Sequence, residues 1–156
     1  MRAEFINPFI KSAIDVLDQL ADLKLEKTEL TLREDPTPSN EISIIIGITG
    51  FIQGQVVYSL KSHTAERIAQ SMKPNTSVQV DQEFIESAMA EMANIITGRS
   101  TIELSGQDRK LHITPPSIII GRDFKIQFIK SKTICVNLGS RFGTIEINIA
   151  VRESII

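Results

Sequence analysis

Residues 83–98 read EFIESAMAEMANIITG, and this stretch organises the rest of the chain. Its apolar residues recur every three or four positions, which is the spacing of one face of an α-helix. On a wheel of about 100° per residue, these residues fall within an arc of roughly 140°. We therefore predict a helix that buries this arc against a sheet. The arc consists of Phe84, Ile85, Ala88, Met89, Met92, Ile95 and Ile96.

The opposite face of this helix carries Glu91 and Asn94, which are three positions apart and therefore neighbours on its surface. Solvent-exposed helix faces usually carry long charged side chains, but the residues around this pair are small. Such a face indicates that another surface comes close to it. An ordinary solvent-exposed face is the alternative at this point. The small residues are Ser87, Ala90, Thr97, Gly98 and Thr101.

The composition predicts one soluble globular domain over residues 1–156. The hydrophobic share is 42% and the charged share is 23%. The net charge of −2 provides no broad basic field, so nucleic acid is not an expected partner. No apolar run is long enough to cross a bilayer, and the N-terminus lacks a signal-peptide pattern. We expect a cytoplasmic protein without a membrane partner.

The cysteine and histidine residues predict neither a disulfide nor a metal site. Cys135 is the single cysteine, so an internal disulfide is excluded and a reducing compartment is favoured. It lies in the strand-like run 133–138, where a buried, inert thiol is expected. His63 and His112 have no cysteine or second histidine near them at ligand spacing, so we predict no zinc site.

The first half of the chain is predicted to contain two helices and a strand pair. Pro8 fits the first turn of the first helix, where a missing N–H costs little. Ser62 or Thr64 is predicted to cap the second helix, which residues 73–75 end. The predicted helices span 4–25 and 64–72, a polar loop spans 33–40, and the two strands span 42–50 and 54–60.

In the second half, Asp81 is predicted to cap the long helix, and Gly98 to mark a bend or a close approach. Pro115 and Pro116 forbid helix and lead into a strand. The last strand alternates apolar and polar residues, so we predict one solvent-exposed face for it. The predicted strands span 117–121, 125–129, 133–138 and 143–151.

Three short matches, in the same order in both halves, predict a duplicated helix-plus-strands unit. Aligned on the first match, Glu91 and Asn94 correspond to Ser12 and Asp15. The first helix therefore lacks the pair, so helix packing does not require it. The matches are EFI at 4–6 and 83–85, SIIIG at 43–47 and 117–121, and the runs 54–60 and 143–149.

Two runs carry a family resemblance, EMANIITG at 91–98 and ITPPSIIIGRD at 113–123. Together they resemble the CheX proteins of the CheC/CheX/FliY phosphatase family. The run IGITG at 46–50, with Gly54 and Tyr58, is also similar to CheX, so that the similarity covers nearly the whole chain. One departure is Ala90, where these proteins often have glycine before the glutamate.

Pattern and resemblance together predict an α+β, CheC-like fold. We expect a mostly antiparallel sheet of about six strands, with the two long helices packed together on one face. The resemblance also implies a function in bacterial chemotaxis, a form of two-component signalling. It implies hydrolysis of the aspartyl-phosphate on a CheY-type response regulator.

The roles implied for the helix residues follow from the chemistry of an acyl phosphate, which mainly needs a water held in line with the leaving oxygen. Asn94 would position that water, and Glu91 would anchor a lysine beside the regulator's phosphorylation site. Ser87, Ala90, Thr97 and Gly98 would let the helix approach the regulator. The chain itself would bind no cofactor or metal, since Mg²⁺ is expected on the regulator.

Two further expectations concern partners. A non-catalytic docking module, like the flagellar-switch proteins of similar fold, is the alternative function; the presence of Glu91 and Asn94 favours the enzyme. We also expect neither an appended C-terminal switch domain nor a separate N-terminal regulator-binding peptide, which favours the enzyme as well. CheX proteins are typically homodimers joined through their sheets, so we expect a homodimer. The last strand or the strand at 125–129 would form its edge.

Overall fold

The computed structural model describes residues 3–33, 37–38, 40–73, 79–107, 109–122, 125–127 and 132–154. Within these residues the chain forms helices α1 (Ala3–Ala21), α2 (Ser62–Met72) and α3 (Gln82–Ser105). Its strands are β1 (Glu26–Arg33), β2 (Thr37–Pro38), β3 (Ile42–Gly50), β4 (Ile52–Leu60), β5 (Leu111–Ile113), β6 (Ser117–Ile120), β7 (Lys125–Ile126), β8 (Thr133–Ser140) and β9 (Gly143–Glu153).

The main sheet has seven strands, and every described pairing in it is antiparallel. The order is β1-β8-β9-β4-β3-β5, and β6 pairs with the part of β3 that β5 leaves free. β2 and β7 form a separate two-stranded sheet. The predicted mostly antiparallel sheet is confirmed. The prediction lacks β1 and β5 of this sheet, and β2 lies in the predicted loop 33–40. The partner of β1 is β8, about a hundred residues later in the chain.

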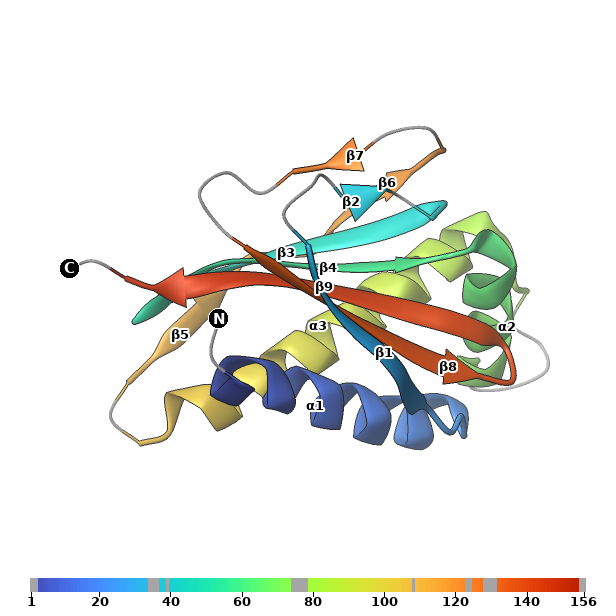
Figure 1. Cartoon of the computed structure of the whole chain (residues 1–156). Coiled ribbons are helices and arrows are strands. Elements are labelled where there is room, and N and C mark those ends of the chain that lie inside the picture. Colours follow the sequence, from blue (N-terminus) through green and yellow to red (C-terminus); the bar gives the residue numbers. More distant parts are fainter. Residues whose placement is uncertain are drawn as a thin grey trace.

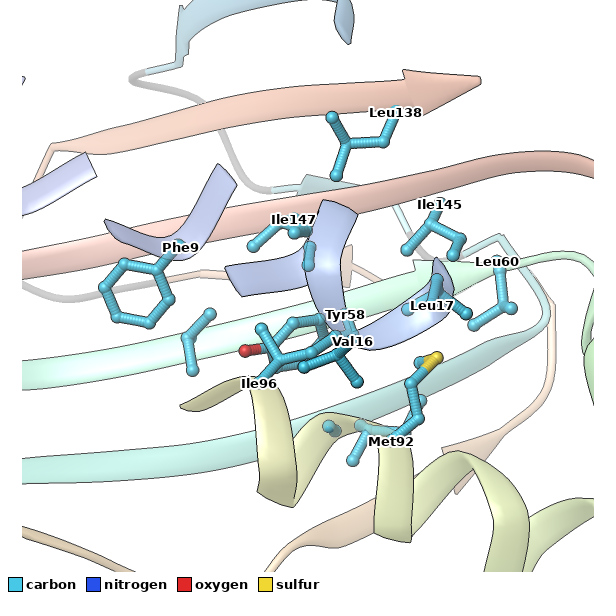
Figure 2. Packing of buried hydrophobic residues seen from close by; sticks show 14 of the residues in the cluster. Phe9, Val16, Leu17, Tyr58, Leu60, Met92, Ile96, Leu138, Ile145 and Ile147 are labelled. Carbon is cyan, nitrogen blue, oxygen red and sulfur yellow. The ribbon is translucent and has the colours of Figure 1, made fainter. Parts of the chain in front are cut away.

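Helices α1 and α3 lie together on one face of the main sheet, and the β2–β7 pair lies on the opposite side (Figure 1). The prediction of two long helices on one face is therefore confirmed. The core forms where the buried faces of both helices meet the sheet, as Figure 2 shows. It contains Phe9, Val16 and Leu17 of α1, Met92 and Ile96 of α3, and Tyr58, Leu138, Ile145 and Ile147 of the sheet.

The capping residues predicted for the helices are only partly confirmed. Asp81 caps α3 as predicted, because its carboxylate accepts from the backbone N–H of Phe84 at 2.9 Å. The predicted caps of α2 are wrong. Lys61 occupies the N-cap position without a side-chain cap, and the N–H of Ser62 instead donates to Glu41 Oε1 at 3.2 Å.

The first helix is shorter than predicted. It ends at Ala21 rather than Leu25, because Asp22 adopts the left-handed conformation with φ 48°. The N–H of Leu23 then donates to the carbonyl of Leu17 at 3.1 Å, which closes the last turn. Pro8 is the sixth residue of α1 and lies in the second turn, not the first as predicted.

Gly98 does not mark a bend, because α3 continues through it to Ser105. Nor is it a close approach to another described element, since a Cβ built there would meet nothing within 4 Å beyond its own helix turn. The helix can continue into the core because its buried hydroxyl groups donate hydrogen bonds to carbonyl groups of the same helix. Ser100 donates to the carbonyl of Ile96 at 2.7 Å, and Thr101 donates to the carbonyl of Gly98 at 3.0 Å.

The last strand differs from the prediction of one exposed face. β9 lies between β8 and β4, so it is a central strand and cannot be a sheet edge. Asn148 and Ala150, on its predicted exposed face, are buried. Asn148 Nδ2 donates to the carbonyl of Val57 at 3.4 Å. The strand predicted at 125–129 is described only as β7, while Phe128 and Ile129 lie outside the described residues.

The predicted duplication is right in outline but wrong in its middle match. The sheet order is symmetric about the β9–β4 pair, so β3 corresponds by position to β8 and β1 to β5. Tyr58 and Ile147, which the last match equates, are direct partners across that central pair. The run at 117–121 contains β6, which instead pairs with β3 itself. The two SIIIG runs are therefore similar in sequence but are not equivalent strands of the repeat.

Candidate active site

Glu91 and Asn94 both lie on the exposed face of α3. They are neighbours on the helix surface, about 5–6 Å apart at Cβ for this spacing. In the described part of the chain, neither side chain makes a hydrogen bond or ion pair. The buried face of the same helix fixes their position through Met89, Met92 and Ala93. The site thus offers a carboxylate and an amide from a rigid support to whatever approaches.

The small residues predicted around the pair divide into two groups. Ser87 is exposed, and Ala90 and Gly98 are half-buried, so these three border the pair on the outer surface. Thr97 is wrong as a partner contact, because its side chain is fully buried. It lies about 120° around the helix from Glu91, on the side of the core. Thr101 is buried as well.

Thr97 instead belongs to a buried polar contact between α3 and the sheet. Its Oγ1 lies 2.7 Å from the hydroxyl of Tyr58 and donates to the carbonyl of Ala93, also at 2.7 Å. Figure 2 shows Tyr58 of β4 beside Ile96 of α3. Burial raises the pKa of Tyr58 above its usual range, so the phenol stays neutral. This contact joins a central strand to the α3 turn that follows Asn94.

Sequence analysis missed Tyr58 as a residue that supports the site. The available signal is that a tyrosine in a buried strand needs a partner for its hydroxyl. Thr97 is the hydroxyl residue on the helix face that packs on that strand. The pair was missed because a threonine next to an exposed site was interpreted as part of the surface.

The ITPPSIIIGRD run holds an edge of the sheet together. The backbone N–H of Thr114 donates to the carbonyl of Gly47 at 3.0 Å. In return, the N–H of Gly47 donates to Thr114 Oγ1 at 2.9 Å. A Cβ on Gly47 would lie 3.0 Å from the Thr114 methyl, so glycine suits this position. Thr114 therefore bridges the break between β5 and β6 on β3.

The end of the same run is tied to α2 by charge. Arg122 donates to Glu41 Oε2 from two nitrogens, at 2.7 and 3.2 Å. The hydrogen bonds from Arg122 and from the backbone of Ser62 hold the pKa of Glu41 below its ordinary value. Through Glu41, Arg122 is thus linked to the beginning of α2. Asp123, the last residue of the run, lies outside the described residues.

Comparison with known proteins identifies the family. A model of the family described as chemotaxis phosphatase CheX matches residues 42–138, more than half of the chain. The chain belongs to the CheX family. The resemblance found in the sequence is thereby confirmed, and with it the enzyme class, a phosphatase.

Individual relatives agree with the CheX assignment. The CheY-P phosphatase CheX of Thermotoga maritima is 27% identical over 127 residues, which are 81% of this chain and 82% of that protein. A chain of the CheX-CheY-BeF3-Mg²⁺ complex of Borrelia burgdorferi is 27% identical with a TM-score of 0.78, covering 97% of this chain and 100% of its own.

The CheC-like fold is confirmed by structural similarity. A CheC-like superfamily protein from Shewanella sp. PV-4 has a TM-score of 0.84. It is 24% identical and covers 97% of this chain and 99% of that one. None of these matches assigns a role to Glu91 or Asn94, so their roles stay predictions.

Two further predictions for this CheX-family chain concern metal binding and the membrane. Among the described residues, no group of three or more His, Cys, Asp and Glu side chains is placed to hold a metal ion. The expectation that the chain binds no cofactor stays a prediction. No helix in the described ranges is both long enough and apolar enough to span a membrane.

Proposed function

We propose that the chain hydrolyses the aspartyl-phosphate of a CheY-type response regulator in chemotaxis. The observation that carries this proposal is the exposed Glu91 and Asn94 pair, which has no partner among the described residues and lies on a helix whose opposite face is buried in the core. The Thermotoga relative is named a CheY-P phosphatase, and the Borrelia relative is found in a complex with CheY, which supports the choice of substrate.

Asn94 is the residue proposed to act on the water. Its amide carbonyl accepts a hydrogen bond from the water, while its NH₂ group can donate to the phosphoryl oxygens. An acyl phosphate is already activated, so placing the water in line with the leaving oxygen is the main requirement. Positioning of this kind supplies a factor of about 10² to 10⁴. No shifted pKa is needed, which suits an exposed side chain.

Glu91 is proposed as the anchor for the regulator's active-site lysine. A carboxylate one helical turn from Asn94 can pair with a cation beside the phosphoryl group while Asn94 reaches the water. Mg²⁺ on the regulator's own carboxylates would neutralise the phosphoryl charge, so this chain would need no metal. Both side chains then act in one cleft that exists only in the complex.

Ser87, Ala90 and Gly98 are proposed to let the regulator approach the backbone of α3. All three border the pair, and none carries a long side chain. Ala90 stands where related proteins often have glycine, so its methyl group sets the closest approach on that side. Thr97 takes no part in this contact because it is buried.

The test of the function is phosphate release from a panel of phosphorylated response regulators encoded by the same organism. We expect this chain to make at least one regulator release phosphate faster than that regulator does by itself. A chain that binds phosphorylated regulators but accelerates none of them would be the docking module considered above. The proposed function depends on the regulator's lysine and Mg²⁺. It would also be contradicted if the chain accelerated hydrolysis of a small acyl phosphate but of no phosphorylated regulator.

We further propose that the protein forms a homodimer in the cytoplasm. With β9 excluded as an edge, we place the contact on β1, which is one of the two outer strands of the described main sheet and whose Leu30 and Leu32 are half exposed. Antiparallel pairing of two β1 strands about Thr31 would place Leu30 opposite Leu32 of the second copy. The same register would place Glu29 opposite Arg33, so charges also match.

The dimer is tested by light scattering at micromolar concentration. The wild-type chain is expected at twice its monomer mass, and Leu32→Lys is expected at the monomer mass because it places a charge in the edge contact. Leu32 is exposed, so the variant should keep the fold. A monomeric wild type would contradict the dimer, and a dimeric variant would exclude the β1 edge.

A further inference from the structure

The C-terminal half of α3 exposes a large apolar side chain that the proposed function does not use. Ile102 is 74% exposed, the highest value among the large hydrophobic residues in the described ranges. A side chain this exposed contributes little to the core of this chain. Its position on the helix relative to the catalytic pair indicates a different role.

Ile102 lies in line with Glu91 along the helix. Residues 91, 95, 98 and 102 follow the spacing i, i+4, i+7 and i+11, which on a wheel of about 100° per residue keeps them within roughly 60° of one another. We call these four residues, Glu91, Ile95, Gly98 and Ile102, the outer stripe. Ile95 is half-buried at its side, and Glu91 and Ile102 are fully on the surface.

The distance from the catalytic pair is within reach of one partner. At 1.5 Å per residue, Ile102 stands about 12 Å along the helix axis from Asn94 and about 16 Å from Glu91. A typical protein interface covers about 800 Å² on each partner, a patch roughly 30 Å across. A regulator centred on Asn94 therefore covers Ile102 unless its surface curves away.

Gly98 leaves the helix open between the pair and Ile102. Among the described residues, a Cβ built there would meet nothing within 4 Å beyond its own helix turn. A partner surface that reaches Glu91 can therefore pass close over the backbone at Gly98 and continue to Ile102. No long side chain of the outer stripe stands in this path.

We propose that Ile102 is a second docking contact for the phosphorylated response regulator, buried against an apolar patch beside the regulator's phosphorylation site. This inference rests on the proposed function, because the regulator is placed by Glu91 and Asn94. Glu91 recognises the regulator's charge, and Ile102 adds affinity that is independent of the phosphoryl chemistry. Ile102 sets how tightly a regulator is held, while the reaction rate at saturation depends on Asn94.

The experiment measures binding and turnover of the full chain with a regulator that it dephosphorylates. Ile102→Ala and Ile102→Gln both remove the apolar contact, and both residues favour helix, so the fold is kept. Each is expected to weaken binding of the beryllofluoride-activated regulator roughly tenfold, which would place Ile102 among the minority of interface residues that dominate binding. Phosphate release at saturating regulator is expected to stay at the wild-type rate.

Glu103→Ala is the matched control, because Glu103 is also exposed on the next position of α3 but points about 100° away from Ile102. It is expected to leave both binding and turnover unchanged. Equal losses in the Glu103 and Ile102 variants would indicate a general change in the helix end and overturn the proposal.

Two outcomes separate this inference from the proposed function. If the Ile102 variants bind like wild type while Asn94→Ala stops turnover, the docking contact is wrong and the function stands. If Asn94→Ala leaves turnover unchanged, the proposed function itself fails. A change of mass in light scattering for Ile102→Ala, with unchanged affinity for the regulator, would assign Ile102 to self-association and also overturn the proposal.

Discussion

Helices α1 and α3 perform the same structural task but present opposite kinds of outer surface. Both pack on one face of the sheet and against each other (Figure 1). The outward positions of α1 carry long or charged side chains, as a solvated helix does. Those of α3 that lie in line with the catalytic pair are small, apolar or part of the pair, whereas the exposed Arg99 and Glu103 lie to one side of them. The residues are Asn7, Lys11, Asp15 and Gln19 on α1, and Ser87, Glu91, Asn94, Gly98 and Ile102 on α3.

The burial patterns of the two helices also correct the alignment between them. Buried positions coincide when α3 is shifted by eighty residues, so Glu91 corresponds to Lys11 and Asn94 to Ile14. The shared EFI letters had instead paired them with Ser12 and Asp15. The conclusion is unchanged, since α1 has no acid–amide pair in either alignment. Packing on the sheet thus fixes the buried face of each helix and leaves its outer face free to vary.

The largest effect on binding of the regulator is expected for Glu91→Ala. Losing the carboxylate would leave the regulator's lysine without its partner, which costs about 2 kcal/mol or more for a desolvated pair. We expect binding of the activated regulator and kcat/KM to fall by about 30-fold or more. The matched control is Lys11→Ala on α1, which should change neither. A wild-type affinity for Glu91→Ala in a titration would count against the anchor role.

Gly98→Ala is expected to have a smaller effect. It should raise the stability of the chain but lower its affinity for the regulator. Because a Cβ at Gly98 meets nothing in the chain, the change should stabilise α3 by about 0.5–1 kcal/mol. The same methyl group would stand between α3 and the regulator, so affinity should fall by several-fold, roughly 1 kcal/mol of overpacking. Thermal unfolding and a binding titration measure the two quantities.

Ala90→Gly is the reciprocal variant of Gly98→Ala. Removing the methyl group should destabilise α3 by about 1 kcal/mol, since glycine is a poor helix former. It should also tighten binding of the regulator. If both variants changed stability but not affinity for the regulator, the regulator would not approach α3 at these positions. The difference between the outer faces of α1 and α3 would then have no effect on docking.

Tyr58→Phe tests the buried contact that holds α3 on the sheet. The hydroxyl lies 2.7 Å from Thr97 Oγ1, and its loss should lower the free energy of unfolding by about 1 kcal/mol. For a chain of this size, that lowers Tm by about 2–4 °C. A double-mutant cycle with Thr97→Val should show the two changes to be coupled. Additive changes would mean that the two hydroxyls do not support each other.

The smallest effect is expected from Cys135, on the face of the sheet away from the helices. Burial raises the pKa of its thiol to about 12. The unfolded thiol ionises near its ordinary value of 9.0, so this contribution to stability is complete below that pH and is lost as pH rises towards 12. Thiol labelling of the native protein at pH 8 should be slow. Rapid labelling would contradict the burial of Cys135.

The features that the sequence predicts well are those set by near neighbours in the chain. The apolar repeat of α3, its Asp81 cap and the β3–β4 pair all depend on residues a few positions apart. β1 is harder to predict, because its run EKTELTLR has only two apolar residues, and its strand conformation depends on pairing with β8. The burial of Asn148 likewise depends on where β9 lies in the sheet.

The candidate site shows the same limit. Glu91 and Asn94 were found from helical spacing together with the family resemblance, and the structure places both on one exposed face. Thr97 was misplaced because its residue type was given more weight than its angle on the helix, which directs it to the core. Tyr58 lies on another element, so its contact with Thr97 follows only from the packing of α3 on β4.

The central claim is that the outer face of α3 positions the water that hydrolyses the aspartyl-phosphate. Asn94→Ala tests it most directly, by phosphate release at saturating phosphorylated regulator together with binding of the beryllofluoride-activated form. Asp15→Ala, on the outer face of α1, is the control. We predict that Asn94→Ala binds nearly as wild type does but loses at least about 100-fold in accelerated release. Release at the wild-type rate would contradict it.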